Sequence, residues 1–221
     1  VDDYDRSNDT GGGELDILWI LTMLAIVAVG AILRSPATKG RIGELKVQAV
    51  GGLRLNKSTY RSFHNLTLPT YDGTTQIDHV IVSKFGVFVI ETKNMKGWIF
   101  GDARSRRWTQ VIYGKKYPFQ NPLNQNYKHI KAVENILPLH PRCLHSVVVF
   151  VGDSTFKTEM PPNVLKGGRL IRYIKSKREA LLSDSEVEES VRILAKAQTA
   201  RSATRREHIE ALKKNRRQPI C

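Results

Sequence analysis

Three residues of this sequence have types and a spacing that could do chemistry on a phosphodiester: Asp78, Glu91 and Lys93. Two carboxylates that meet form an oxygen-rich site, and such a site suits Mg2+ or Mn2+. A metal held there would polarise the phosphate and activate water, while the lysine ammonium would stabilise charge or orient the nucleophile. The alternative is a solvent-facing strand that carries scattered charges and a Glu–Lys pair.

A β-hairpin is the element that would bring the two carboxylates together. Two runs dominated by β-branched and aromatic residues, 77–82 and 87–90, flank the sequence Ser-Lys-Phe-Gly. This pattern predicts two strands joined by a four-residue loop. Pairing Val82 with Val87 opposes the two carboxylates, and the period-two alternation of strand side chains predicts one shared face. The polar residues on that face are Gln76, Asp78, Glu91 and Lys93. Opposed like charges ~5 Å apart destabilise a strand pair, so a bridging cation is the simplest explanation.

The same residues and their flanks resemble a known family. Asp78, a gap of twelve residues and then Glu91-Thr92-Lys93 are similar to the core motif of the PD-(D/E)xK nucleases. The flanking sequence resembles the nuclease-related domain, NERD, over about residues 39–137. The matching motifs, in order, are Gly43-Glu44, Gln76-Ile77-Asp78-His79, Val89-Ile90-Glu91-Thr92-Lys93-Asn94, Gly97, Trp108, Asn121-Pro122-Leu123 and Gln125. Ile77 stands where the superfamily name has a proline, a departure that NERD domains share, and proline is not a metal ligand.

The resemblance implies an α/β fold with a restriction-endonuclease-like mixed central sheet flanked by helices. It also implies metal-dependent cleavage of nucleic acid, with DNA as the expected substrate and Mg2+ or Mn2+ as the cofactor. Asp78 and Glu91 would bind the metal with help from the Thr92 carbonyl, and Lys93 would orient or activate the attacking water. The alternative is a membrane-tethered nucleic-acid-binding protein with a degenerate site. A requirement for a divalent cation would separate the two.

Two further residues are candidates for supporting roles. Glu44 lies near the first turn of a helix expected at 41–50, and in the resembling family this glutamate points at the metal site. From its position alone, it could equally be an ordinary glutamate favoured by a helix N-terminus. Gln125 lies on a helix after the Glu-x-Lys strand, where RecB-like nucleases carry a glutamine, so it is an auxiliary active-site candidate. His129 has no evident partner and is expected to be structural.

The charge distribution favours a polyanionic partner. The formal net charge is +14, although residues 1–33 hold six acidic residues against one arginine, so the remainder carries +19. So large a basic excess indicates nucleic acid or an anionic membrane surface, with solubility alone as the other explanation. The two cysteines, Cys143 and Cys221, form no Cys-x-x-Cys pair. This excludes a zinc ribbon and a disulfide scaffold, and it suits a reducing compartment.

The N-terminal part predicts a membrane anchor. Residues 1–14 form a short polar, acidic tail, and residues 17–33 follow without a charge. At ~1.5 Å per residue this run covers about 25 Å, and its flanks extend it to an expected transmembrane helix at 15–34. A cleaved signal peptide competes with this interpretation, but its first region should be basic and this one is acidic. Basic residues follow the span, so the C-terminal domain is expected in the cytoplasm, at the inner membrane.

The remaining chain predicts a nuclease-like domain at 35–180 and a basic helical extension at 181–221, which would contact phosphates or lipid headgroups or simply be solvated. Strands are expected at 60–66, 98–101, 108–113, 146–151 and 169–174. The run 146–151 is wholly apolar, which predicts a buried strand, parallel to its neighbour.

Helix ends and aromatic residues complete the pattern. Asn121 as N-cap and Pro122 at the first position predict a helix to about 137. Ser183 with Glu186 predicts a capping box for a helix through about 198. Basic residues lie beside four aromatic residues, a mixture that can neutralise phosphates and stack bases. These aromatic residues are Trp98, Trp108, Tyr113 and Tyr117. Exposed hairpin arginines and a packed core tryptophan explain the same residues equally well.

Overall fold

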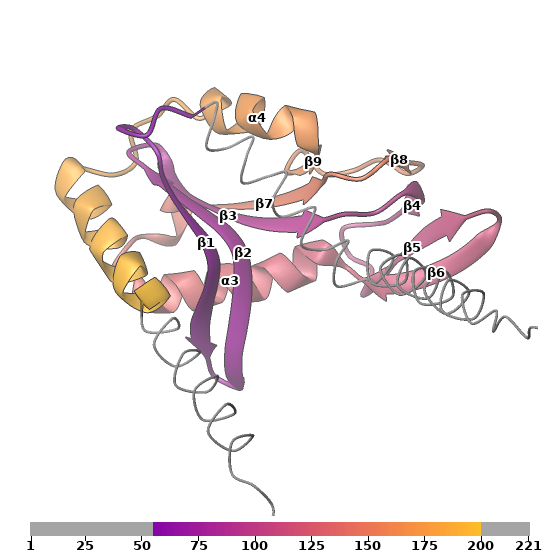
Figure 1. The fold of residues 1–221 in the computed structure, drawn as a ribbon, viewed down its shortest axis with the longest axis horizontal. Coiled ribbons are helices and arrows are strands. Elements are labelled where there is room, and N and C mark those ends of the chain that lie inside the picture. Colours follow the sequence, from indigo (N-terminus) through magenta and orange to yellow (C-terminus); the bar gives the residue numbers. More distant parts are fainter. Residues whose placement is uncertain (1–54, 200–221) are drawn as a thin grey trace, which may run out of the picture. The chain divides into compact units, whose positions relative to one another are not determined.

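The computed structural model describes residues 55–199. The expected transmembrane helix at 15–34, Glu44 and the basic extension beyond 199 lie outside these residues, so what was expected of them stays a prediction. Between 55 and 199, no helix has the length and apolar character needed to cross a membrane. This part of the chain contains two mixed β-sheets and the helices packed on them (Figure 1).

The larger sheet has five strands in the order β1-β2-β3-β7-β9. β1 to β3 are antiparallel, whereas β3, β7 and β9 run parallel. The strands are β1 Arg61–Thr70, β2 Gly73–Ser83, β3 Gly86–Lys93, β7 Leu144–Phe150 and β9 Val164–Lys166. The predicted hairpin is confirmed, with Val82 opposite Val87. Its predicted four-residue loop is wrong, because Ser83 pairs with Gly86 and only two residues, 84 and 85, form the turn. The parallel pairing of the apolar strand β7 with β3 is also confirmed. The expected mixed sheet flanked by helices is therefore present.

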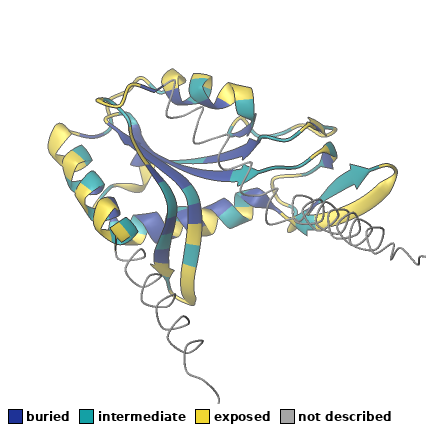
Figure 2. Ribbon diagram, in the orientation of Figure 1, coloured by how far each residue is buried: buried dark blue, intermediate teal, exposed yellow. Residues whose placement is uncertain are grey.

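Side chains of alternating strand residues point to opposite faces of the sheet. Both faces carry apolar side chains, and helices pack on each of them. On one face, Val80, Val82 and their β3 neighbours pack against α3, Pro122–Ile136, and against the helix at 184–199. On the other face, Phe88 and Ile90 pack against α4, Leu170–Ser176. Figure 2 shows β3 mostly buried between the helices, whereas the ends of β1 and β2 near their shared turn are exposed.

Both helix starts predicted from the sequence are confirmed. Asn121 caps α3 by accepting a hydrogen bond from Leu123 N–H, and Pro122 is the first helical residue. Ser183 and Glu186 form a capping box, in which the Glu186 carboxylate accepts from Ser183 N–H at 2.8 Å and Ser183 Oγ accepts from Glu186 N–H at 3.3 Å.

A second sheet of four strands, in the order β6-β5-β4-β8, follows the larger one. Its strands are β4 Gly97–Phe100, β5 Arg107–Ile112, β6 Lys115–Gln120 and β8 Ser154–Phe156. Three residues separate β3 from β4, and three separate β7 from β8, so two short segments connect the sheets. Trp108 is buried and stacks on Phe150, with ring centroids 6.2 Å apart. This tryptophan therefore holds the two sheets together and is not available to bases.

The expected strand at 169–174 is wrong. The structure has a 3-10 turn, Gly167–Arg169, followed by α4. Leu170 and Ile174 are both buried, and their separation of four residues is helical, but so short an apolar segment cannot be told from a strand by pattern alone. The sequence pattern also leaves β8 and β9 unpredicted, because each has only three residues. It leaves β6 unpredicted because two lysines and a proline interrupt its apolar pattern. A second 3-10 turn, Pro141–Cys143, before β7 is also not predicted.

The turn between β5 and β6 contains an unfavourable residue. Ile112 pairs with Lys115, which leaves Tyr113 and Gly114 as a two-residue turn. Both have positive φ, 49° and 76°, as a type I′ turn requires. Asparagine followed by glycine suits such a turn, whereas a left-handed backbone costs an ordinary residue roughly 1–2 kcal/mol. Tyr113 is 93% exposed, so burial in the core does not offset this cost.

Replacing this tyrosine should stabilise the protein. We expect Tyr113→Asn to raise the free energy of unfolding by about 1 kcal/mol, because asparagine tolerates the left-handed backbone. Urea denaturation of the full chain, followed by circular dichroism, measures the change. Tyr117→Asn, on the neighbouring strand β6, is the control and should give no gain. A loss of stability in Tyr113→Asn would show that the ring contributes to the fold.

Candidate active site

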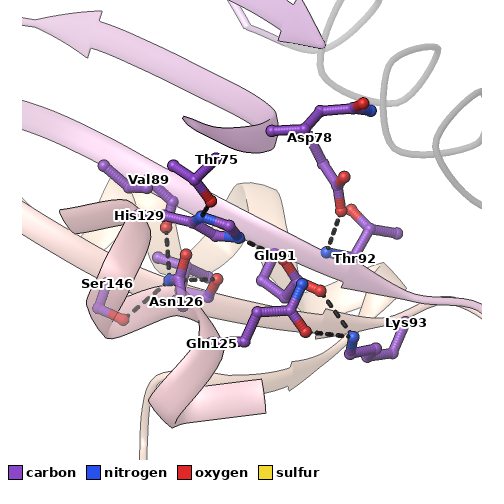
Figure 3. A network of polar contacts seen from close by, with 12 residues as sticks. Thr75, Asp78, Val89, Glu91, Thr92, Lys93, Gln125, Asn126, His129 and Ser146 are labelled. Atoms are coloured by element: carbon purple, nitrogen blue, oxygen red, sulfur yellow. Dashed lines mark hydrogen bonds and ion pairs between the residues drawn. The ribbon is translucent and has the colours of Figure 1, made fainter. Parts of the chain in front are cut away.

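The C-terminal end of β3 carries two of the predicted site residues. Glu91 and Lys93 are two residues apart on one strand, so their side chains lie on the same face. Lys93 Nζ lies 2.7 Å from Glu91 Oε1 (Figure 3). The Glu91 side chain is 3% exposed and that of Lys93 is 21% exposed. The Glu91–Lys93 ion pair therefore lies at the edge of the core, with the Lys93 ammonium partly exposed to solvent.

Helix α3 supplies the second half of this cluster. Gln125 and His129 are one helical turn apart and so share a helix face. Gln125 Oε1 accepts a hydrogen bond from Lys93 Nζ at 2.8 Å. His129 Nε2 lies 3.1 Å from Glu91 Oε2, and its Nδ1 lies 2.9 Å from Thr75 Oγ1. Because an ionised carboxylate only accepts hydrogen bonds, His129 Nε2 carries the proton and donates.

The expectation that His129 has no partner is wrong. It is buried and contacts Glu91 directly, which makes it the residue of this cluster that the sequence pattern missed. Its separation of four residues from Gln125 is the signal that could have found it, because such residues lie on one face of a helix.

The surroundings keep Glu91 ionised despite its burial. Loss of solvent raises the pKa of a carboxyl group, but the hydrogen bond from His129 and the charge of Lys93 outweigh that effect and hold the pKa of Glu91 below its usual value. Glu91 is thus a carboxylate at neutral pH, which is the form that binds a hard cation.

A buried amide positions α3 against the strands. The Asn126 side chain is fully buried, and its Nδ2 donates to Val89 O at 3.0 Å, Val147 O at 3.2 Å and Ser146 Oγ at 2.8 Å. These contacts join the helix to β3 and β7 together. Because Asn126 follows Gln125 directly, its docking sets where Gln125 meets Lys93.

Asp78 lies where the pairing of β2 with β3 ends and its pairing with β1 is interrupted. The pairing of β2 with β3 ends at His79, and the pairing of β1 with β2 skips Asn65 and Asp78. Asn65 has φ 54°, a left-handed backbone that asparagine adopts more readily than most residues. The Asp78 carboxylate accepts a hydrogen bond from Thr92 N–H at 2.8 Å. Asp78 therefore reaches across to β3 one residue beyond Glu91 (Figure 3).

The donor set fits Mg2+ or Mn2+ without a larger cluster. No group of three or more His, Cys, Asp or Glu residues in the described range is placed to hold a metal. Mg2+ is commonly bound by one or two carboxylates and keeps waters or substrate phosphates as its other ligands. An ionised Glu91 and an aspartate on the next strand match this requirement. The bridging of both carboxylates by one cation, with the Thr92 carbonyl as a further ligand, stays a prediction.

Comparisons with known proteins identify the family. Residues 39–151 match the family model of the nuclease-related domain, NERD. The chain is 33% identical over 206 residues to an uncharacterised protein of Bacillus anthracis, and the alignment covers 90% of this chain and 96% of that relative. No solved structure matches the chain significantly. The matched range includes all of the cluster from Thr75 to His129, and the chain belongs to the nuclease-related domain (NERD) family.

Proposed function

We propose that the chain is a membrane-anchored nuclease that hydrolyses phosphodiester bonds of DNA and depends on Mg2+ or Mn2+. The observation that carries this proposal is the contact of Glu91, Lys93 and Gln125 beside Asp78, in a chain of the nuclease-related family. The proposal places the nuclease domain in the cytoplasm, at the inner membrane, because basic residues follow the apolar run of residues 17–33.

Each residue of the cluster has a distinct task in this proposal. Asp78, Glu91 and the Thr92 carbonyl would hold the cation, which when bound polarises the phosphate and favours ionisation of water. Lys93, with its ammonium on the solvent side of the ion pair, orients the nucleophile or stabilises the charge that develops on the phosphate. Gln125 holds the Lys93 ammonium in place, and His129 fixes the rotamer of Glu91. Glu44 stays a candidate for positioning water.

A second function is favoured by one observation. Both oxygens of Glu91 already contact groups of the same chain, Lys93 and His129, which is also what a purely structural network would show. A membrane-tethered nucleic-acid-binding protein with a degenerate site would keep these contacts and the net charge of +14 while lacking turnover. A nuclease should need a divalent cation for turnover, whereas such a binding protein should hold nucleic acid equally well with or without the cation.

Cleavage should require both the metal and the cluster. We expect the full chain, purified in detergent, to nick or degrade plasmid DNA with Mg2+ or Mn2+ and to be inert in EDTA. Glu91→Gln and Lys93→Ala should each lower the rate by about 100-fold or more, the scale of losing one group of the chemical step. Glu134→Gln, which removes an α3 carboxylate paired with Lys131 and outside the cluster, is the matched control and should keep the wild-type rate. If Glu91→Gln cleaved at the wild-type rate, the site assignment would be wrong. The function of a membrane-tethered nucleic-acid-binding protein would then replace the proposed one.

Binding without metal should respond to the two residues in opposite directions. Removal of the Lys93 cation should weaken metal-free affinity for DNA modestly, because a charge near the scissile phosphate is lost. Removal of the Glu91 anion in Glu91→Ala should leave that affinity level or raise it, because a charge that repels phosphate is lost. Filter binding in EDTA over a salt series measures both effects. The slope of affinity against salt should stay within about one phosphate contact of wild type, since dispersed lysines and arginines dominate it.

The membrane anchor has its own test. Fractionation of cells that express the full chain should recover it in the inner membrane after washes with high salt and with alkaline carbonate. A helical span resists both treatments, whereas a basic surface held by anionic lipids is released by salt. Recovery in the salt wash would contradict the anchor and leave electrostatic attachment as the explanation.

A further inference from the structure

One face of the second sheet combines an exposed indole with several cations. In the strand register, Trp98 on β4 lies opposite Val111 on β5 and Thr155 on β8, and Val111 lies opposite Lys116 on β6. Opposed residues point to the same side of a sheet, so these four side chains form one row across it. We call this row, with Tyr113 in the adjoining turn, the Trp98 face. Trp98 is 52% exposed, whereas Ile99 beside it points into the core and is fully buried.

A hollow opens on the Trp98 face. Its volume is about 490 Å3, and its lining includes Lys96, Trp98, Tyr113, Asp153 and Thr155. Sites for small ligands usually enclose about 300–1,000 Å3 and combine aromatic walls with a few polar groups. This hollow has two aromatic rings, a cation, a carboxylate and a hydroxyl, which matches a planar heterocycle with polar edges.

Lysines lie directly over both rings. Lys157 Nζ is 4.6 Å from the centre of the Trp98 ring, and Lys96 Nζ is 5.6 Å from the centre of the Tyr113 ring. A nucleotide presents a flat base next to a phosphate, and this pairing of ring and ammonium matches both parts. Because lysine has a long flexible stem, its ammonium can move to the phosphate while a base takes its place on the ring.

The backbone at Tyr113 argues against a merely structural role for its ring. Its φ of 49° is unfavourable for tyrosine, and its side chain is 93% exposed. An exposed aromatic ring held at a strained turn position has no part in the core. Unfavourable backbone conformations cluster at ligand sites, so a binding role for this ring is a hypothesis that the turn supports.

We propose that the Trp98 face is a stacking site for an unpaired base, so that the substrate is nucleic acid with a single-stranded segment. This inference rests on the proposed function, since it names the form of substrate that the same protein takes. In a duplex the flat faces of the bases are covered by their neighbours, and only an unstacked base can lie against an indole. Asp153 and Thr155 lie where they can contact the edge of that base.

The Trp98 face lies close enough to Lys93 to hold the same strand. Trp98 is five positions after Lys93 along the chain, which limits the distance between their Cα atoms to about 18 Å. At ~3.4 Å per stacked nucleotide, this distance is about five nucleotides or fewer. A strand that contacts both Trp98 and Lys93 would therefore need only a few nucleotides between the two places.

Binding of two probes by the full chain in EDTA tests the inference. The probes are a fluorescein-labelled oligothymidine of about 20 nucleotides and a duplex of the same length, and anisotropy measures both affinities. We expect Trp98→Ala to weaken binding of the single strand by roughly ten-fold and binding of the duplex by less than about two-fold. Trp98→Phe should restore most of the loss. The salt slope should not change, because no charge is removed.

Two further variants separate stacking from general effects. Tyr113→Asn should weaken single-strand binding although it stabilises the fold, which a structural role would not produce. Tyr71→Ala removes another exposed ring, from the turn between β1 and β2, and should change the affinity for neither the single strand nor the duplex. Equal losses for both probes in Trp98→Ala, or no loss for the single strand, would overturn the stacking site.

Failure of the inference and failure of the proposed function remain distinguishable. If metal-dependent cleavage occurs but Trp98→Ala binds the single strand normally, the protein is a nuclease and the stacking site is wrong. If no cleavage occurs with any metal but single-strand binding depends on Trp98, the stacking site stands on a protein that binds without cutting.

Discussion

An ionised carboxylate with almost no access to solvent is the constraint on which this structure depends. Glu91 lies at the end of a central strand and is 3% exposed. Burial of a charge without partners is very unfavourable, and even a paired buried charge recovers its lost hydration only with good geometry. Lys93 and His129 supply that geometry from two different elements. The position of α3 relative to β3 is therefore part of the site, because a displaced helix would leave the carboxylate without His129.

Two asparagines meet this constraint by tying α3 to both sheets. Asn126 donates to main-chain carbonyls of β3 and β7, so the helix rests across the parallel pair. Asn121 caps the helix and also donates to Ser105 O at 2.7 Å, in the loop that leads into β5. Side-chain amides can satisfy several backbone groups at once, and both of these are fully buried. The Asn121-Pro122-Leu123 motif is thus explained by how it anchors a helix start.

The parts of the site that local rules govern could be predicted from the sequence. The pairing of Val82 with Val87 followed from the two apolar runs of the hairpin, and the start of α3 followed from capping chemistry. The contact of His129 with Glu91 could not be predicted, because it depends on how a helix docks on a strand 38 residues away. The left-handed backbone at Asn65 could not be predicted for a similar reason. A left-handed asparagine in a strand has no local signature, and its effect appears only in the interrupted pairing beside Asp78.

The junction between the sheets determines how the active site and the Trp98 face act together. Val151 N–H donates to Lys93 O at 3.0 Å and Gly97 N–H donates to Asp153 O at 2.8 Å, so the two crossing segments are bonded to each other. They also lie too close for a side chain, since a Cβ on Gly152 would be 2.1 Å from Met95 O. With Trp108 stacked on Phe150 beneath them, the segments have little freedom to hinge. Lys93 and Trp98 are consequently held at one spacing, and a strand bound at both would meet the carboxylates in a single register.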